Sequence, residues 1–169
     1  MRAPNLWVDL DPDLKCQDES LLAIHRYWLD KRGDRLFPSR EDIDPIDLAP
    51  HLGNLVLIEV THKPLRLRYR LIGTRITQVM GRDSTGKYYD EIYPERLLRA
   101  IYVSFEWMID HRRPLRTHGE AFYPDRNFYH YETLNLPLSS DGESIDMVLG
   151  GLVFHPADTA PAADAPAGD

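Results

Sequence analysis

The stretch that most constrains the fold runs from residue 65 to residue 87, because its hydrophobic pattern changes twice within this short length. Apolar residues alternate with arginines from Leu65 to Leu71, and successive side chains of a strand point to opposite faces, so this segment predicts a half-buried strand. Gly73 and Thr74 suit a strand end followed by a helix start, and later glycines mark a second turn. This succession favours an antiparallel sheet wrapped by short helices, a shape that commonly holds small molecules.

The bulk composition limits the class of protein. A chain of 169 residues can bury a real core, since folding removes roughly 70% of the unfolded surface from water at this size. The longest apolar run, MVLGGLVF, is too short to span a membrane. The first residues contain no apolar segment as long as that of a signal peptide. With Cys16 as the single cysteine, a cytoplasmic location is expected. A net charge of -7 argues against a nucleic acid as a partner. Since the apolar runs are short as well, a membrane is not expected as a partner either.

The chain divides into three parts. Residues 1–17 lack periodicity and are expected to form an N-terminal arm, and residues 156–169 have the composition of a disordered Ala/Pro/Asp tail. Residues 18–155 hold all the periodic segments and predict one α+β domain. Its expected elements are a helix at 21–29, strands at 55–60 and 65–72, a helix at 94–109, and strands at 115–123, 128–138 and 145–154.

The first expected helix has an apolar stripe that includes Leu21, Ile24 and Trp28. This stripe has two interpretations. The helix can cover the core of its own domain, or it can pack against a second copy of the chain, which the anchor-type residues Tyr27 and Trp28 favour. The sequence leaves both open.

Four phrases in this order resemble a known family: YWLDKRGDRLFPSREDIDP, RYRLIGTRI, GRDSTGK and LNLPLSSDGESIDMVLGG. They are similar to the stand-alone bacterial PAS proteins formerly catalogued as a domain of unknown function. The resemblance implies a PAS-like, five-stranded antiparallel sheet in spatial order 2-1-5-4-3, with helices covering one face, an N-terminal flanking helix and a cavity between sheet and helices. It implies a sensory rather than catalytic role. It leaves the cofactor unknown, because PAS domains hold haem, flavin, organic acids or nothing.

The turns predict a register for the two C-terminal hairpins. If Ser140 pairs with Glu143 across Asp-Gly, leucines of the strand at 128–138 face apolar residues of the last strand. The expected pairs are Leu138 with Ile145, Leu136 with Met147, and Leu134 with Leu149. We expect this face to be the core.

If the alternation of the leucines continues back along the strand at 128–138, four polar residues reach the same face. We call His118, Glu120, His130 and Glu132 the polar quartet. If Tyr123 closes against Asn127, then His118 lies opposite Glu132 and Glu120 lies opposite His130. Three interpretations are open. The quartet can form ordinary cross-strand charge pairs at the open end of the sheet, it can form the polar end of a ligand pocket, or it can bind a metal. No metal ligands are assigned.

The remaining pocket residues are expected to be apolar. Simple core packing is the competing interpretation for each of them, because every such domain needs many apolar residues inside. The predicted lining consists of Tyr69, Met80, Ile101, Phe105, Met108, Leu134, Leu136 and Met147.

The sequence therefore predicts a sensory or regulatory module that binds a small molecule or a protein partner and signals through dimerisation or partner contacts. It is not expected to be an enzyme. Two rivals remain: a ligand-free interaction module, and a small α+β enzyme that uses the His-Glu quartet as acid and base.

Overall fold

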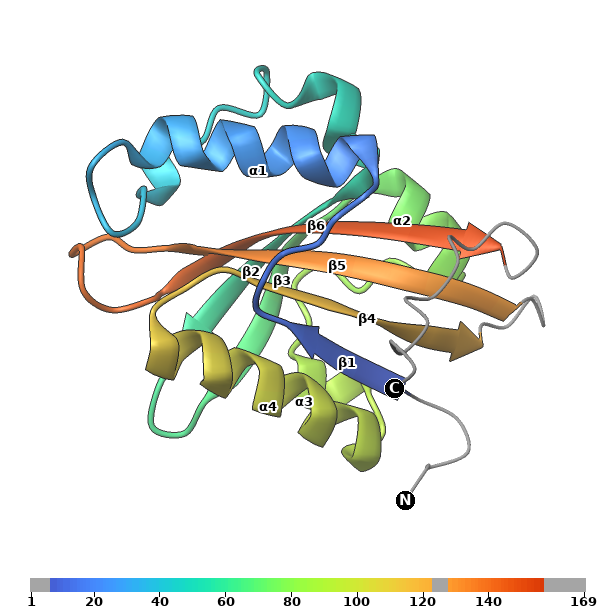
Figure 1. Ribbon diagram of the computed structural model, residues 1–169. Coiled ribbons are helices and arrows are strands. Elements are labelled where there is room, and N and C mark those ends of the chain that lie inside the picture. Colours follow the sequence, from blue (N-terminus) through green and yellow to red (C-terminus); the bar gives the residue numbers. More distant parts are fainter. Residues whose placement is uncertain (1–6, 123–127, 157–169) are drawn as a thin grey trace, which may run out of the picture.

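The computed structural model describes residues 7–122 and 128–156, which form a six-stranded antiparallel sheet with helices on both sides (Figure 1). The strands in chain order are β1 (Trp7–Asp11), β2 (Leu55–Thr61), β3 (Arg66–Ile72), β4 (Leu115–Phe122), β5 (Phe128–Leu138) and β6 (Met147–Pro156). Across the sheet they follow the order β1-β4-β5-β6-β2-β3. The predicted α+β class is confirmed, and the five predicted strands have the predicted order.

The sheet has one strand more than predicted, so the count of five is corrected. β1 lies in the segment expected to form an arm and pairs with β4, with Trp7 opposite Glu120 and Asp11 opposite Arg116. Five residues are too few to show a hydrophobic period, and backbone hydrogen bonds to the neighbouring strand stabilise this one. The turn at 124–127 and the tail at 157–169 lie outside the described residues.

One face of the sheet is covered by α1 (Glu19–Arg32), which crosses β5 and β6 (Figure 1). The Asp18 carboxylate caps this helix by accepting hydrogen bonds from the backbone N–H groups of Ser20 (2.8 Å) and Leu21 (3.2 Å). Gly33, at φ 56°, ends it. The sequence position of these caps explains why the helix begins and ends where it does.

The apolar stripe of α1 packs on its own sheet. Leu21, Ile24 and Trp28 are buried, and the Trp28 indole N–H donates a hydrogen bond to the Pro137 carbonyl at 2.9 Å. The helix lies so close that a Cβ at Gly151 of β6 would be 2.7 Å from Leu21 Cδ2. The stripe is thus used within the domain, which is the first of its two interpretations.

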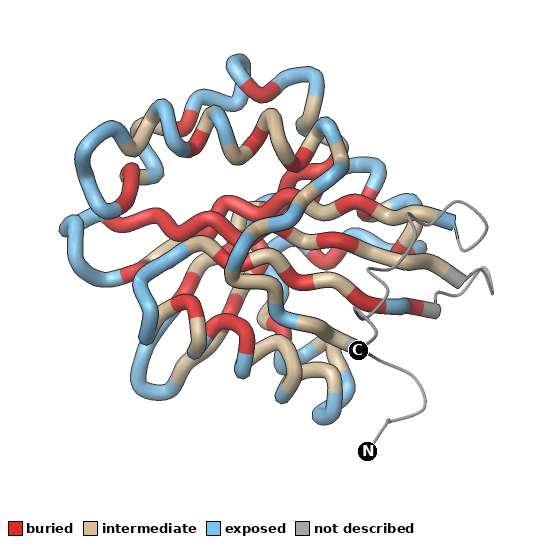
Figure 2. The backbone as a smooth tube through the Cα atoms, viewed as in Figure 1, coloured by how far each residue is buried: buried red, intermediate tan, exposed pale blue. Residues whose placement is uncertain are grey.

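The opposite face carries α3 (Tyr89–Ile92) and α4 (Glu95–His111), while α2 (Thr74–Met80) packs against a 3-10 helix at Ala49–Asn54. A shorter 3-10 helix, Arg40–Asp42, lies in the connection between α1 and β2. Buried residues consequently follow the central strands and the inward sides of the helices on both faces (Figure 2). The sheet has two covered faces, and this determines where a cavity can form.

The arginine row of the 65–87 stretch is neutralised by acids. Arg66 makes two bonds to the Asp90 carboxylate (2.8 and 2.9 Å) and lies 3.7 Å from the centre of the Tyr88 ring. Arg68 donates to Glu59 at 2.7 Å. The third arginine, Arg70, is half exposed and lies 3.7 Å from the same Glu59 carboxylate, so each arginine of the row has an acidic neighbour.

Asp141 organises the turn between β5 and β6. Its carboxylate accepts hydrogen bonds from the backbone N–H groups of Glu143 (2.8 Å) and Ser144 (2.7 Å) and from the Ser139 hydroxyl (2.9 Å). These donors favour the ionised form and lower the pKa of Asp141 from 3.8 to about 2. The charged carboxylate is therefore part of the folded turn.

This depressed pKa predicts an acid-dependent loss of stability. The contribution of Asp141 is fully present above its unfolded pKa of 3.8 and is lost as the pH falls towards 2. In Asp141→Asn, the free energy of unfolding should therefore fall less between pH 4.5 and 2 than in the unmodified protein, as measured by urea unfolding at each pH. Glu143→Gln in the same turn is the matched control, and an unaltered pH slope in Asp141→Asn would contradict this assignment.

Candidate functional site

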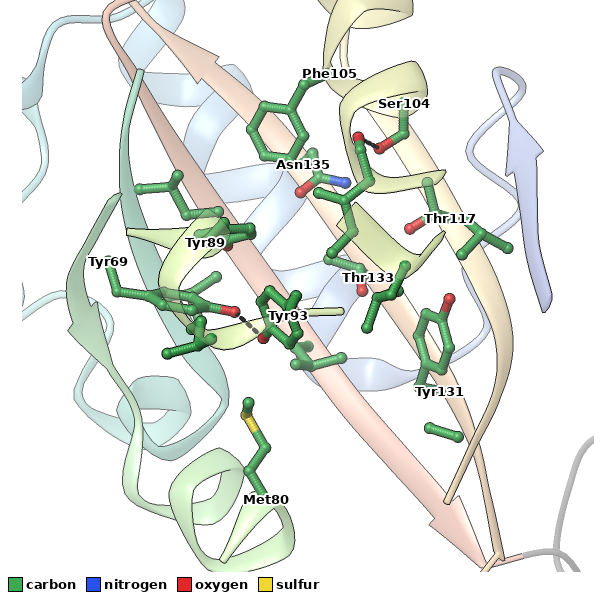
Figure 3. Close-up of a pocket in the computed structure, with 18 of the residues that line it drawn as sticks. Tyr69, Met80, Tyr89, Tyr93, Ser104, Phe105, Thr117, Tyr131, Thr133 and Asn135 are labelled. Atoms are coloured by element: carbon green, nitrogen blue, oxygen red, sulfur yellow. Dashed lines mark hydrogen bonds between the residues drawn. The ribbon is translucent and has the colours of Figure 1, made fainter. Parts of the chain in front are cut away.

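A cavity of about 450 Å³ lies between the sheet and the helices on the α4 side (Figure 3). This volume is within the range of small-molecule sites. Its walls come from the strands, from α3 and α4, and from the segment that follows α2. The lining residues are Val8, Val56, Ile58, Tyr69, Met80, Gly81, Arg82, Tyr89, Ile92, Tyr93, Pro94, Leu97, Ile101, Ser104, Phe105, Thr117, Ala121, Tyr131, Thr133, Asn135, Leu152 and Phe154.

The parity of the strands decides which side chains reach the cavity. On β5 the odd-numbered residues Tyr131, Thr133 and Asn135 line it, whereas the even-numbered Leu134 and Leu136 point to the face that α1 covers. The even side of β5 is the more apolar one. The cavity therefore lies on the less hydrophobic face of this strand.

Four predicted pocket residues line the cavity, namely Tyr69, Met80, Ile101 and Phe105. They come from β3, the end of α2 and the inner side of α4. Met80 and Phe105 are buried. That these four side chains contact a ligand stays a prediction.

Four other predicted apolar residues do not line the cavity, and their expected place is corrected. Met108 is fully buried in the core beneath α4. Leu134 lies opposite Gly151, which faces α1, and Leu136 lies on the same side of β5 as Leu134. Met147 lies on the same side of β6 as Gly151, so all three are on the α1 face. Their role is core packing, which was the competing interpretation.

The polar quartet has the predicted pairing on the other face. His118 lies opposite Glu132, and Glu120 lies opposite His130, as the turn predicted. However, all four belong to the even-numbered face, away from the cavity, so their expected place at a pocket end is corrected. His118 and Glu120 are half exposed, which fits cross-strand charge pairs at the open end of the sheet.

The charge pairs of the quartet histidines are long. His130 Nδ1 lies 3.9 Å from Glu120 Oε1 within the quartet, and His118 Nδ1 lies 3.9 Å from Oδ2 of Asp9, which is on β1. Across residues 7–122 and 128–156, no group of three or more histidine, cysteine or acidic side chains converges as a metal site would require.

Glu132 instead belongs to a buried ion network that the sequence did not reveal. Arg116 donates to Glu132 Oε2 at 2.9 Å and to Asp11 Oδ2 at 3.0 Å, and all three side chains are at most 13% exposed. Burial alone would raise the pKa of Asp11, but hydrogen bonds from the Lys15 N–H and Arg116 outweigh it and lower that pKa. Through Arg116 the network links β1 to its neighbour β4 and to β5 beyond it.

Cys16 lies near this network and does not line the cavity. Its burial raises the pKa of the thiol to about 11, so the side chain is protonated at neutral pH. This is the chemistry of an inert, ordinary thiol.

Hydroxyl groups line much of the cavity. The hydroxyls of Tyr69 and Tyr93 are 2.7 Å apart and are hydrogen-bonded, and the ring of Tyr89 lies 4.4 Å from that of Tyr69 (Figure 3). Burial raises the pKa of Tyr89 well above its usual range, so it stays neutral. A neutral phenol donates a hydrogen bond, and this part of the wall is therefore polar but uncharged.

A second polar group faces the tyrosines from β4, β5 and α4. It comprises Ser104, Thr117, Thr133 and Asn135 (Figure 3). Sequence reasoning missed these residues because it treated the odd side of β5 as the outer face. The signal was present as two polar residues, Thr133 and Asn135, that alternate with buried leucines.

Comparisons with known proteins now place this fold. The sequence profile described as "PAS domain" matches residues 16–153. Among solved structures, an RNA-binding light-oxygen-voltage receptor aligns with a TM-score of 0.51 and 13% identity, covering 90% of this chain and 40% of the receptor chain. The chain thus spans less than half the length of that receptor.

A second solved structure, a sensory box histidine kinase/response regulator from Burkholderia thailandensis E264, aligns with a TM-score of 0.43 and 13% identity. That alignment covers 67% of this chain and 86% of the other. No curated protein matches the sequence. Within the described part of the chain, no helix has the length and hydrophobicity needed to cross a membrane.

Proposed function

This chain belongs to the PAS domain family, and we propose that it is a sensory module that binds a small molecule in the cavity between the sheet and α4. The observation that carries the proposal is the cavity itself. It combines about 450 Å³ of space and mainly apolar walls with a few inward polar groups, which is the usual make-up of a ligand site.

Ligand binding can act on the fold through the contact between β3 and the start of α4. The hydrogen bond between Tyr69 and Tyr93 joins the sheet to the segment that leads into α4. A ligand that binds more tightly to one arrangement of these elements shifts the population towards it. In this proposal, occupancy changes how α3 and α4 pack on the sheet, and a homodimer or a signalling partner reads that change.

The N-terminal strand is the second route by which occupancy can reach the surface. Val8 of β1 lines the cavity, and Asp11 of the same strand is held by Arg116. A ligand in contact with Val8 therefore alters the docking of an edge strand. The net charge of -7 favours a protein partner over a nucleic acid in the cytoplasm.

The test compares molecules that co-purify with the full chain and with a variant whose cavity is filled. Native mass spectrometry of the unmodified protein should show a bound small molecule, and Thr133→Trp should lose it, because the indole occupies the cavity. Thr133→Val is the matched control, since it keeps the side-chain volume.

The outcomes separate the proposal from its rivals. A bound molecule in the unmodified protein and in Thr133→Val, but not in Thr133→Trp, supports ligand sensing. If none of the three proteins carries a bound molecule, and if adding a small-molecule extract leaves each melting temperature unchanged, a ligand-free interaction module is favoured instead.

A further inference from the structure

One side-chain amide in the cavity has no hydrogen-bond partner among the described residues. Asn135 is only 4% exposed, yet its side chain makes no hydrogen bond to any of the described residues. Polar groups inside a protein normally find a donor or an acceptor, so an amide on a cavity wall is available to pair with a molecule bound there. Its place on the cavity wall points to a partner outside the chain (Figure 3).

A hydroxyl beside it is in the same condition. Thr117 is 5% exposed and lines the cavity, and its hydroxyl has no hydrogen bond within residues 7–122 and 128–156. Thr133 lies directly opposite Thr117 in the pairing of β4 and β5. Ser104, by contrast, donates its hydroxyl to the Ile101 carbonyl at 2.6 Å and is satisfied within α4. The unsatisfied groups therefore gather on the sheet.

An amide offers a carbonyl acceptor and an N–H donor side by side. A group that satisfies both must likewise carry a donor beside an acceptor, as another amide does, whether a carboxamide or a ring lactam. A carboxylate offers only acceptors and an ammonium group only donors, so either would leave one half of Asn135 unpaired.

The charge of the walls supports an uncharged ligand. Among the lining residues Arg82 alone is charged, and it lies exposed at the rim, where its guanidinium donates to the Ile92 carbonyl at 3.3 Å. No acidic side chain lines the cavity in the described residues, so a cation has no counter-charge there.

The shape of the ligand follows from the rings. Aromatic side chains from several elements face the cavity, and rings favour stacked or edge contacts with other rings. These side chains are Tyr69, Tyr89, Tyr93, Phe105, Tyr131 and Phe154.

We propose that the cavity binds an uncharged aromatic molecule that carries an amide-type group, and that Asn135 selects this group through paired hydrogen bonds. The inference rests on the proposed ligand-binding function. It assigns Asn135 a role in specificity, with Thr117 as a second hydrogen-bonding group.

The test uses probes that share one ring system and differ in the polar group: 2-naphthamide, 2-naphthoate, 2-naphthylmethylamine and 2-methylnaphthalene, each titrated into the full chain at pH 7. We expect 2-naphthamide to bind at least about tenfold more tightly than the other three, which corresponds to one or two net hydrogen bonds. In Asn135→Leu, that preference should disappear while 2-methylnaphthalene still binds. In Thr117→Val, a smaller loss of about fivefold is expected.

A stability measurement separates selection from a structural role. Because no described residue pairs with the Asn135 amide, Asn135→Leu should unfold at the same urea concentration as the unmodified chain or at a higher one. A clear loss of stability in Asn135→Leu would assign the side chain to the fold and overturn the inference.

The remaining outcomes distinguish this inference from the proposed function. Equal affinities for the four probes, or a preference that survives Asn135→Leu, would overturn the selection by Asn135 and leave ligand binding intact. If no probe binds but a small molecule co-purifies, the aromatic amide class is wrong. If no probe binds and nothing co-purifies, the proposed function itself fails.

Discussion

Replacing Arg116 by methionine is expected to lower the free energy of unfolding by about 3–5 kcal/mol, the usual cost of removing one partner from a buried ion pair. Arg116 is the shared partner of Asp11 and Glu132, and its loss leaves two carboxylates with side chains 12% and 6% exposed. Urea unfolding at neutral pH measures the change. Hydrogen exchange at residues 7–11 should accelerate, because β1 loses its side-chain tie to β4.

The control for this prediction removes the two carboxylates together with the guanidinium group. A triple variant, Arg116→Met with Asp11→Leu and Glu132→Leu, replaces the network by apolar side chains and should recover most of the lost stability. If the triple variant is as unstable as Arg116→Met, packing of the arginine stem and not the unpaired charge would explain the effect.

Truncating Trp28 to alanine should also cost about 3–5 kcal/mol of unfolding free energy, because a large ring is removed from a packed site that cannot fully collapse. The indole is 1% exposed and its N–H bonds to the Pro137 carbonyl. Trp28→Phe keeps most of the ring packing but leaves that carbonyl unpaired, so its cost should be about 1–3 kcal/mol.

The Trp28 variants also test the use of the α1 stripe. Measurements at two protein concentrations should give the same loss, since a contact within one domain does not depend on association. A loss that grows on dilution would show that the stripe packs against a second copy of the chain.

The register of β4 against β5 was predictable, because the alternation of residues along the strands and the expected turn give the same pairing. His118 lies opposite Glu132 as expected. The register between β5 and β6 differs by two residues from the prediction, with Leu138 opposite Met147 and not opposite Ile145. The reason is the turn around Asp141, which is longer than a two-residue hairpin. An even shift preserves which residues share a face, so the error did not scramble the sheet.

The cavity residues were mostly missed for a different reason. The sequence shows which side of β5 is more apolar, and the natural inference places the pocket there. In the structure, that side is the solid core under α1, and the mixed side with Thr133 and Asn135 encloses the cavity. A ligand site needs polar groups, which make its strand face resemble a solvent-exposed one. Only the positions of α1 and α4 resolve this ambiguity.

β1 could not be predicted from local pattern at all. Its five residues gain their conformation from pairing with β4, which lies more than a hundred positions later in the chain. The same is true of the ion network, since Asp11 and Arg116 are brought together only by that pairing.

The lining of the cavity extends from Val8 to Phe154, close to both ends of the described chain. During folding, such a site can be completed only after the last strand has joined the middle of the sheet, and pairing of distant segments is slow. We therefore expect the cavity to be among the last features to form, and a fragment that lacks either β1 or β6 lacks part of its lining. A molecule that occupies it should consequently protect the whole sheet cooperatively, which makes global unfolding a faithful reporter of binding.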